Sequence, residues 1–166
     1  VGASLGGDSL QKSLFAGLVG FLLVMIFMIL YYRLPGFLAA IALIIYGIIT
    51  LFVFKMIPVT LTLSGIAGFI LSFGMAVDAN VLTFERLKEE LKLGKPLATS
   101  IEEGFRRAWP SIRDSNITTM IMAIVLYYFT TSFVKGFALT LFLGVLMSMF
   151  SAITITRTML RVSVKE

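Results

Sequence analysis

The sequence predicts an all-α integral membrane protein, and three observations lead to this fold class. Hydrophobic residues make up 58% of the chain and charged residues only 14%. The mean hydropathy of +1.00 lies in the range of membrane proteins rather than soluble domains. Five apolar segments qualify as crossings of a hydrocarbon core roughly 30 Å thick. We therefore interpret residues 1–166 as a single transmembrane domain with five spans and one additional surface helix.

The first three predicted spans follow one another with short connections. They cover residues 14–32, 37–54 and 61–84. Pro35 and Pro58 lie in the two connections, where a fixed φ and a missing N–H group do little harm. Because the connections are short, we expect neighbouring spans to form antiparallel hairpins.

A long polar segment follows the third span and contains an amphipathic helix over residues 96–109. Pro96 suits the first helical position, and apolar residues then recur at helical spacing while charged residues occupy the other faces. This helix can lie on the cytoplasmic membrane surface with Trp109 among the lipid headgroups. It can equally pack against the ends of the spans.

The fourth and fifth predicted spans cover residues 117–131 and 137–155. The polar residues at the start of the fourth span are Asp114, Ser115, Asn116, Thr118 and Thr119. One of the first three can cap a helix that begins there. Alternatively, Asn116 or one of the two threonine hydroxyls is a polar partner for Asp78 of the third span, since both sites lie toward the cytoplasmic side.

The distribution of basic residues predicts the orientation of the chain. Eleven of the 14 Lys and Arg residues lie on one side of the predicted spans, and most of them follow the third and fifth spans. Only Lys12, Lys55 and Lys135 lie on the other side. By the positive-inside rule, the N-terminus is outside and the C-terminus is cytoplasmic. Five spans also require the two termini to lie on opposite sides.

Asp78 is the acidic residue that interrupts the apolar third span. The sequence carries no charge from Val59 to Asp78, and charge becomes dense only from Glu85 onward. An ionised Asp at the centre of a membrane helix costs roughly 2.5–3.5 kcal/mol, so such a residue is a candidate for ion or proton work. The alternative is a polar lock that bonds a neighbouring helix. Asn80 points from another face of the helix and is a further polar partner, more suited to a bond with another helix.

Small residues are frequent along the third span. Gly65, Gly68 and Gly74 are predicted helix-packing positions, because small residues let membrane helices approach closely. We therefore expect this span to be central. Gly74 lies one turn before Asp78 and leaves space beside the carboxyl group.

The composition excludes several kinds of active site. The chain contains no Cys and no His, which removes thiolate and imidazole metal ligands and the usual proton carrier near neutral pH. It contains no phosphate-binding glycine loop and no nucleophile–base pair. The net charge of +5 is divided among segments between spans rather than gathered on one face, which argues against nucleic acid. We expect no enzyme activity, metal or cofactor, with protons as the only coupling ion.

Four sequence stretches resemble those of a known family. Residues 74–82 read GMAVDANVL and are followed by FER at 84–86; residues 114–119 read DSNITT, 134–138 read VKGFA, and 1–6 read VGASLG. Together they resemble the signatures of the bacterial SecD/SecF protein-export membrane proteins, within the RND superfamily. The Asp-Ala-Asn order favours the SecD branch over the SecF branch, and the resemblance covers essentially the whole chain.

The resemblance implies a fold, a location and a set of partners. It implies five helices of an RND-type six-helix half-bundle in the bacterial inner membrane, with the family's first helix and periplasmic domain absent from these residues. It also implies pairing with SecF, association with the SecYEG translocon and with YajC as a further candidate, and contact with secreted preproteins through the missing domain and with membrane lipid. The family's proton-coupling aspartate corresponds to Asp78.

Three functions follow as hypotheses. The first is a membrane module that uses the proton-motive force to promote protein export, with Asp78 in proton coupling. The second is a structural scaffold that holds SecF and SecYEG together, with Asp78 as an interhelical lock. The third is an RND-type small-molecule exporter, which is weaker because the expected periplasmic substrate path is not present.

Overall fold

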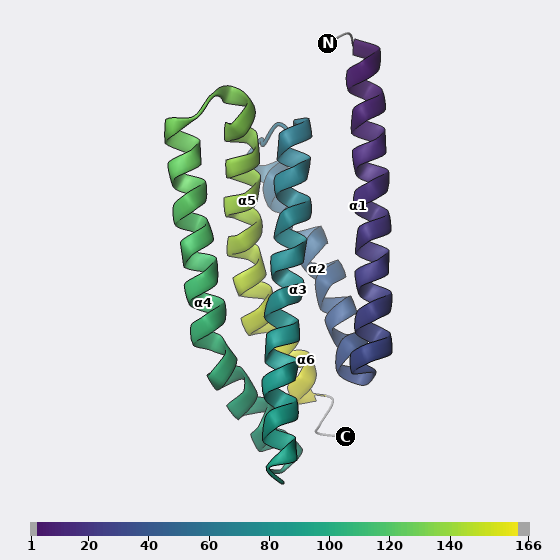
Figure 1. Ribbon diagram of the computed structural model, residues 1–166, viewed down its shortest axis with the longest axis vertical. Helices are drawn as coiled ribbons and strands as arrows, with labels where there is room; N and C mark the ends of the chain where they lie inside the picture. The colour runs from purple at the N-terminus through teal and green to yellow at the C-terminus, as the bar shows by residue number, and fades with distance from the viewer. Residues whose placement is uncertain (1–2, 163–166) are drawn as a thin grey trace.

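The computed structural model describes residues 3–162, in which all regular secondary structure is helical (Figure 1). These are α1 (Ala3–Tyr32), α2 (Leu34–Met56), α3 (Leu63–Lys92), α4 (Leu97–Phe129), α5 (Ser132–Phe150), the π-helix η1 (Ser151–Thr156) and α6 (Arg157–Val162). The predicted all-α membrane fold class is confirmed. Four segments of the described chain are long and apolar enough to cross a bilayer: Gly7–Tyr32, Leu34–Met56, Leu63–Lys92 and Ser132–Val162.

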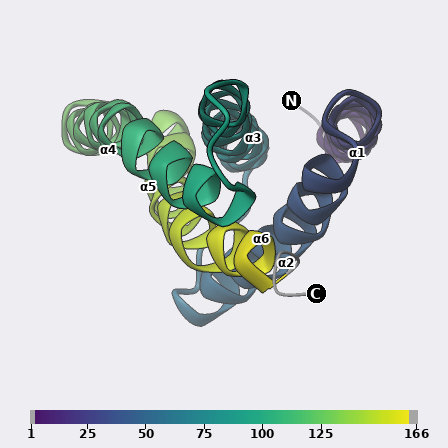
Figure 2. The same ribbon diagram turned by 90° about the horizontal axis from the view of Figure 1, so that it is seen from below.

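Helix α3 occupies the centre of the arrangement. It contacts α1, α2, α4, α5 and η1. Viewed from below, the other helices form a V, with α4, α5 and α6 on one arm and α2 and α1 on the other (Figure 2). Helix α3 lies between these arms, so its faces meet different neighbours along its length.

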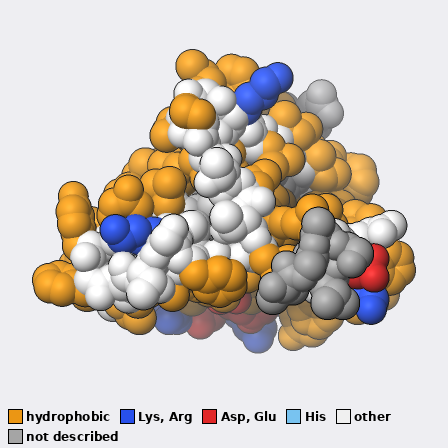
Figure 3. All heavy atoms as spheres, turned by 90° about the horizontal axis from the view of Figure 1, so that it is seen from above, with side chains coloured by type: hydrophobic (Ala, Val, Ile, Leu, Met, Phe, Trp, Pro, Cys, Tyr) orange, Lys and Arg blue, Asp and Glu red, His pale blue; other side chains and the backbone are white. Residues whose placement is uncertain are grey.

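Apolar side chains cover much of the outer surface, as expected for a lipid environment. Viewed from above, they dominate the rim of the molecule (Figure 3). Phe15 on α1, Ile48 on α2 and Phe129 on α4 are among the exposed large hydrophobic side chains. A soluble domain rarely exposes apolar patches of this extent.

The first hairpin is tighter than a conventional turn. A single residue, Arg33, separates α1 from α2 and adopts a positive φ of 53°. Pro35 lies in the first turn of α2, where its missing N–H needs no partner. A Cβ on Gly36 would collide with the backbone carbonyl of Met28, so this close approach requires glycine.

Helix α4 differs from the sequence prediction. The predicted surface helix at 96–109 and the predicted span at 117–131 are two parts of one helix that passes through Pro110. Proline removes one backbone hydrogen bond, and α4 bends toward α3 in its first half (Figure 1). The predicted cap at residues 114–116 is therefore wrong. Ser115 and Thr118 instead bond back to carbonyls of their own helix.

One buried face explains why α4 does not break. Ala108, Ile112 and Asn116 follow one another at intervals of four residues, and all three are buried. Because its first half is charged, α4 is not among the four described segments that are long and apolar enough to cross a bilayer. That residues 117–131 cross the membrane therefore stays a prediction.

The last predicted span, 137–155, covers most of α5 and of η1, and the helical segment continues beyond it through α6. Helix α5 gives way to η1, in which backbone bonds span five residues rather than four, and α6 follows. The widened turn carries Thr156, whose hydroxyl is fully buried and has no partner among the described residues.

Candidate functional site

The first half of α3 packs tightly against α5. Thr62 caps α3 by accepting a hydrogen bond from the Gly65 amide at 3.1 Å. A Cβ on Gly68 would meet the Phe137 carbonyl oxygen at 2.6 Å and would collide with the Thr140 hydroxyl. We call this contact the α3–α5 seam; its residues are Gly65, Gly68 and Ser72 on α3 and Gly136, Thr140 and Gly144 on α5.

A buried tyrosine ties a third helix to the seam. The Tyr46 hydroxyl of α2 lies 2.7 Å from the Ser72 hydroxyl and donates to the Gly144 carbonyl at 3.1 Å. The Ser72 hydroxyl also donates to the Phe69 carbonyl at 2.6 Å. Sequence reasoning missed this contact; a lone tyrosine within the apolar second span was the available signal.

Asp78 lies one to two turns beyond the seam, where the packing opens. A Cβ on Gly74 would meet no atom of another helix within 4 Å, so the described chain does not pack closely against this predicted packing position. Asp78 is exposed and borders a pocket of about 140 Å³ between α3 and α4. We call it the α3–α4 pocket; its lining residues are Met75, Asp78, Ala79, Leu82, Ile112, Ser115 and Asn116.

The Asp78 carboxylate has no hydrogen bond or ion pair to any residue that the structure describes. The two charged residues on the facing part of α4, Arg113 and Asp114, bond each other at 2.9 Å. On α3 the next carboxylate, Glu85, accepts from Tyr32 at 2.9 Å and from Lys88 at 3.2 Å. Within residues 3–162, therefore, no side chain forms an ion pair with Asp78 or holds it by a hydrogen bond.

Of the predicted polar partners on α4, the structure brings only Asn116 to the pocket. Its side chain is 3% exposed, and Nδ2 has no hydrogen-bond partner in the described part of the chain. Thr118 and Thr119 donate to carbonyls of their own helix at 2.8 and 3.0 Å and do not line the pocket.

Asn80 also lies outside the α3–α4 pocket. It is 4% exposed, and its Oδ1 atom has no partner among residues 3–162. Two buried amides on separate helices, Asn116 at the pocket and Asn80 outside it, thus each have one unpaired atom. Buried polar groups without partners are rare and commonly mark functional sites or water sites.

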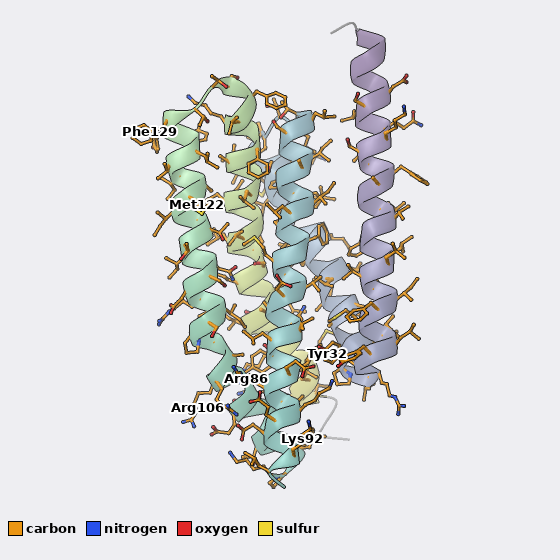
Figure 4. All side chains as sticks on the ribbon, viewed as in Figure 1. Tyr32, Arg86, Lys92, Arg106, Met122 and Phe129 are labelled. Atoms are coloured by element: carbon orange, nitrogen blue, oxygen red, sulfur yellow. The ribbon has the colours of Figure 1, made fainter. Side chains whose placement is uncertain are left out.

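Ion pairs gather at the end of the molecule where α3 finishes and α4 begins, the end that carries Arg86, Lys92 and Arg106 in Figure 4. Glu90 is 2% exposed and accepts from Lys95 and Arg107, each at 2.5 Å. These pairs close the α3–α4 hairpin. The sequence showed dense charge here but not which side chains pair.

Glu102 joins α4 to α6 at the same end. It accepts from Arg157 at 2.5 Å and also from Arg161. The hydrogen bond from Arg161 contributes most and that from Arg157 next, and together they lower the pKa of Glu102 to about 2. The amphipathic half of α4 is therefore held to the protein, as in the second of the two predicted placements.

Comparisons with known proteins agree over the whole chain. The family described as "Protein export membrane protein SecD/SecF, C-terminal" matches residues 1–166. The chain is 60% identical over 166 residues to protein translocase subunit SecD of Thermobaculum terrenum, with 98% of this chain and 32% of that protein aligned. It is 49% identical to protein translocase subunit SecDF of Bacillus subtilis, covering 100% of this chain and 22% of that protein.

A solved structure shares the fold. The crystal structure of SecDF, a translocon-associated membrane protein from Thermus thermophilus, aligns with a TM-score of 0.91 and 40% identity, covering 95% of this chain and 22% of that one. The chain therefore spans about a third or less of the length of these relatives.

Proposed function

The chain belongs to the SecD/SecF family of protein-export membrane proteins, and from this membership we propose that it is the membrane module of a proton-driven accessory to the Sec translocon. In this proposal Asp78 binds and releases the protons that drive export. The observation that carries the proposal is a carboxylate in an apolar helix with no partner among residues 3–162.

The energetics of such a carboxylate favour a functional role. Burying an unpaired charge in the membrane costs several kcal/mol, so residues of this kind persist where they do work. One charge moved through 100 mV supplies about 2.3 kcal/mol. Cycling between a neutral and an ionised carboxyl group changes which contacts the open face of α3 can make, and that change can drive a rearrangement.

The proposed partners follow from the same open face. In this proposal a SecF-type half packs beside Gly74 and Asp78, where the described chain leaves space. The SecYEG channel and YajC are further partners, and segments outside these residues contact the exported preprotein. The module lies in the bacterial inner membrane with its C-terminus in the cytoplasm, where the ion pairs of Glu90 and Glu102 lie. It needs no enzyme activity and no cofactor besides protons.

The test is export into inverted membrane vesicles that carry the full-length protein. Asp78→Asn keeps a hydrogen-bonding side chain of the same shape but cannot release a proton. We expect it to abolish the gradient-dependent part of export and to leave the ATP-driven part intact. Asp114→Asn is the matched control, because Asp114 is exposed, pairs with Arg113 and lies outside the α3–α4 pocket.

Assembly with the partner subunit is verified for both variants before export is measured. A normal gradient response from Asp78→Asn would refute the proton-coupling role. It would support the scaffold hypothesis, in which Asp78 only bonds a partner helix.

A further inference from the structure

Asn116 lines the pocket that contains Asp78, and one atom of its side-chain amide is unpaired. It is the one polar lining residue of the α3–α4 pocket that is buried, and its Nδ2 atom has no partner in the described chain. Nearly all buried polar atoms in proteins are bonded to protein or to ordered water. The Asn116 amide has no protein partner among the described residues, and water is therefore the expected partner.

The α3–α4 pocket has the size and the polar groups that water needs. Its volume of about 140 Å³ exceeds the ~10–15 Å³ that one water requires. An ordered water also needs two to four polar partners. The Asp78 carboxylate offers two acceptor oxygens and the Asn116 amide offers a nitrogen donor or an oxygen acceptor, while the remaining walls are mainly apolar.

Ser115, the other polar lining residue, has already used its single hydroxyl donor and can only accept from water. The Ser115 hydroxyl donates to the Ile112 carbonyl of its own helix at 3.1 Å. A water in the pocket thus has Asp78 and Asn116 as its principal side-chain partners. Either end of the Asn116 amide can bond water, the nitrogen as a donor and the oxygen as an acceptor, so the argument does not depend on which of the two atoms faces the pocket.

Neighbouring charges do not take this role. On α3 and α4, the two helices that line the pocket, the titratable groups nearest in sequence to the lining residues are Glu85, Arg113 and Asp114. Each of them bonds another residue. On the α5–η1 side, residues 136–156 carry no charged side chain. Asp78 is the only titratable residue in the pocket lining.

We propose that Asn116 anchors ordered water against Asp78 and thereby sets how fast that carboxyl group exchanges its proton. Asn116 is then a positioning residue that acts through water. This inference rests on the proposed function, because proton exchange matters only if Asp78 couples protons to export. It adds a residue on α4 and a ligand, water, to that function.

The test is hydrogen–deuterium exchange of the Asp78 carboxyl group, followed by infrared spectroscopy. The full-length protein, assembled with its partner subunit in lipid, is brought to a pH at which the protonated carboxyl band is present and is then transferred to D₂O. The band missing from Asp78→Asn identifies the group. Asn116→Leu, which has a similar shape but no polar atom, is expected to slow exchange at least tenfold.

Two variants separate hydration from packing. Ser115→Ala changes the same pocket but removes a hydroxyl already used by its own helix, and we expect exchange at the rate of the unmodified protein. Asn116→Gln keeps the amide and is expected to retain most of that rate. If Asn116→Leu does not accumulate, the smaller apolar variant Asn116→Val is measured by the same tenfold criterion.

Exchange in the apolar variant as fast as in the unmodified protein would overturn the inference. So would an equal slowing by Ser115→Ala, since that would assign the effect to pocket shape. The result is independent of the export assay. If Asp78→Asn kept its gradient response while Asn116→Leu slowed exchange, the coupling proposal would fail and the water site would stand.

Discussion

The two halves of α3 are built from similar small residues but packed very differently. In the α3–α5 seam, Gly68 lies against the Phe137 carbonyl, and Ser72 bonds the Tyr46 hydroxyl from a third helix. Beside the α3–α4 pocket, Gly74 has open surroundings and Asp78 has no partner within residues 3–162. One helix thus contains a region that this chain completes by itself and a region that it leaves open.

This difference shows which glycines allow close helix packing within this chain and which do not. A membrane helix gains little from the hydrophobic effect against its neighbours, so close packing and interhelical hydrogen bonds must hold the bundle together. The seam supplies both. Gly74 and Asp78 take part in neither, and they are therefore free to meet water or a second subunit.

The largest expected effect comes from filling the seam. Gly68→Ala should lower the free energy of unfolding by about 1–3 kcal/mol, because the new Cβ would collide with the Thr140 hydroxyl and with backbone of α5. Gly74→Ala is the matched control on the same helix and should leave stability unchanged or raise it by up to about 1 kcal/mol. Reversible unfolding in detergent measures both. Equal losses in the two variants would erase the proposed contrast between the halves.

The next effect concerns the hydrogen bonds that cross the seam. Tyr46→Phe removes the hydroxyl that reaches Ser72 and Gly144, and it should destabilise the fold by about 1 kcal/mol. The loss stays modest because the Ser72 hydroxyl keeps its bond to the Phe69 carbonyl. The same unfolding assay applies. A variant as stable as the unmodified protein would show that close packing alone maintains the seam.

The smallest effect is expected at the α4–α6 contact. Glu102→Gln should cost no more than about 1 kcal/mol, because its pairs with Arg157 and Arg161 are partly exposed. The pKa of Glu102 is lowered from 4.5 to about 2, so its contribution is present above pH 4.5 and is lost as the pH falls toward 2. Stability measured from pH 6 to pH 2 should therefore fall less steeply in Glu102→Gln. Parallel curves would contradict this role.

Much of the fold could be predicted because it depends on local properties. Apolar run length indicated α1, α2, α3 and α5, and the density of small residues predicted a central third span. The break expected near residues 114–116 did not occur, because cap-forming side chains also bond within a helix. What distinguishes a helix that starts near residue 114 from one that continues through it is the buried series Ala108, Ile112 and Asn116.

The site was harder to predict because it depends on tertiary contacts. The sequence indicated Asp78 from the cost of a membrane carboxylate, and it offered Asn116, Thr118 and Thr119 as equivalent partners. Only Asn116 lies on the face of α4 that lines the pocket, while Thr118 and Thr119 bond carbonyls of their own helix. The pairing of Glu102 with Arg157 joins residues far apart in the chain, and no local pattern specifies it.

The central claim is that the open half of α3 is completed by a second subunit, and a single engineered cysteine tests it directly. Residues 1–166 contain no cysteine, so Gly74→Cys introduces one thiol beside the α3–α4 pocket. Its maleimide labelling rate is compared in the full-length subunit alone and in the assembled complex. Gly20→Cys on α1, another glycine with open surroundings, is the reference.

We expect the Gly74→Cys thiol to react in the isolated subunit and to react at least tenfold more slowly after assembly, relative to Gly20→Cys. Equal relative rates before and after assembly would contradict the account. They would show that the face bearing Asp78 stays uncovered in the working complex.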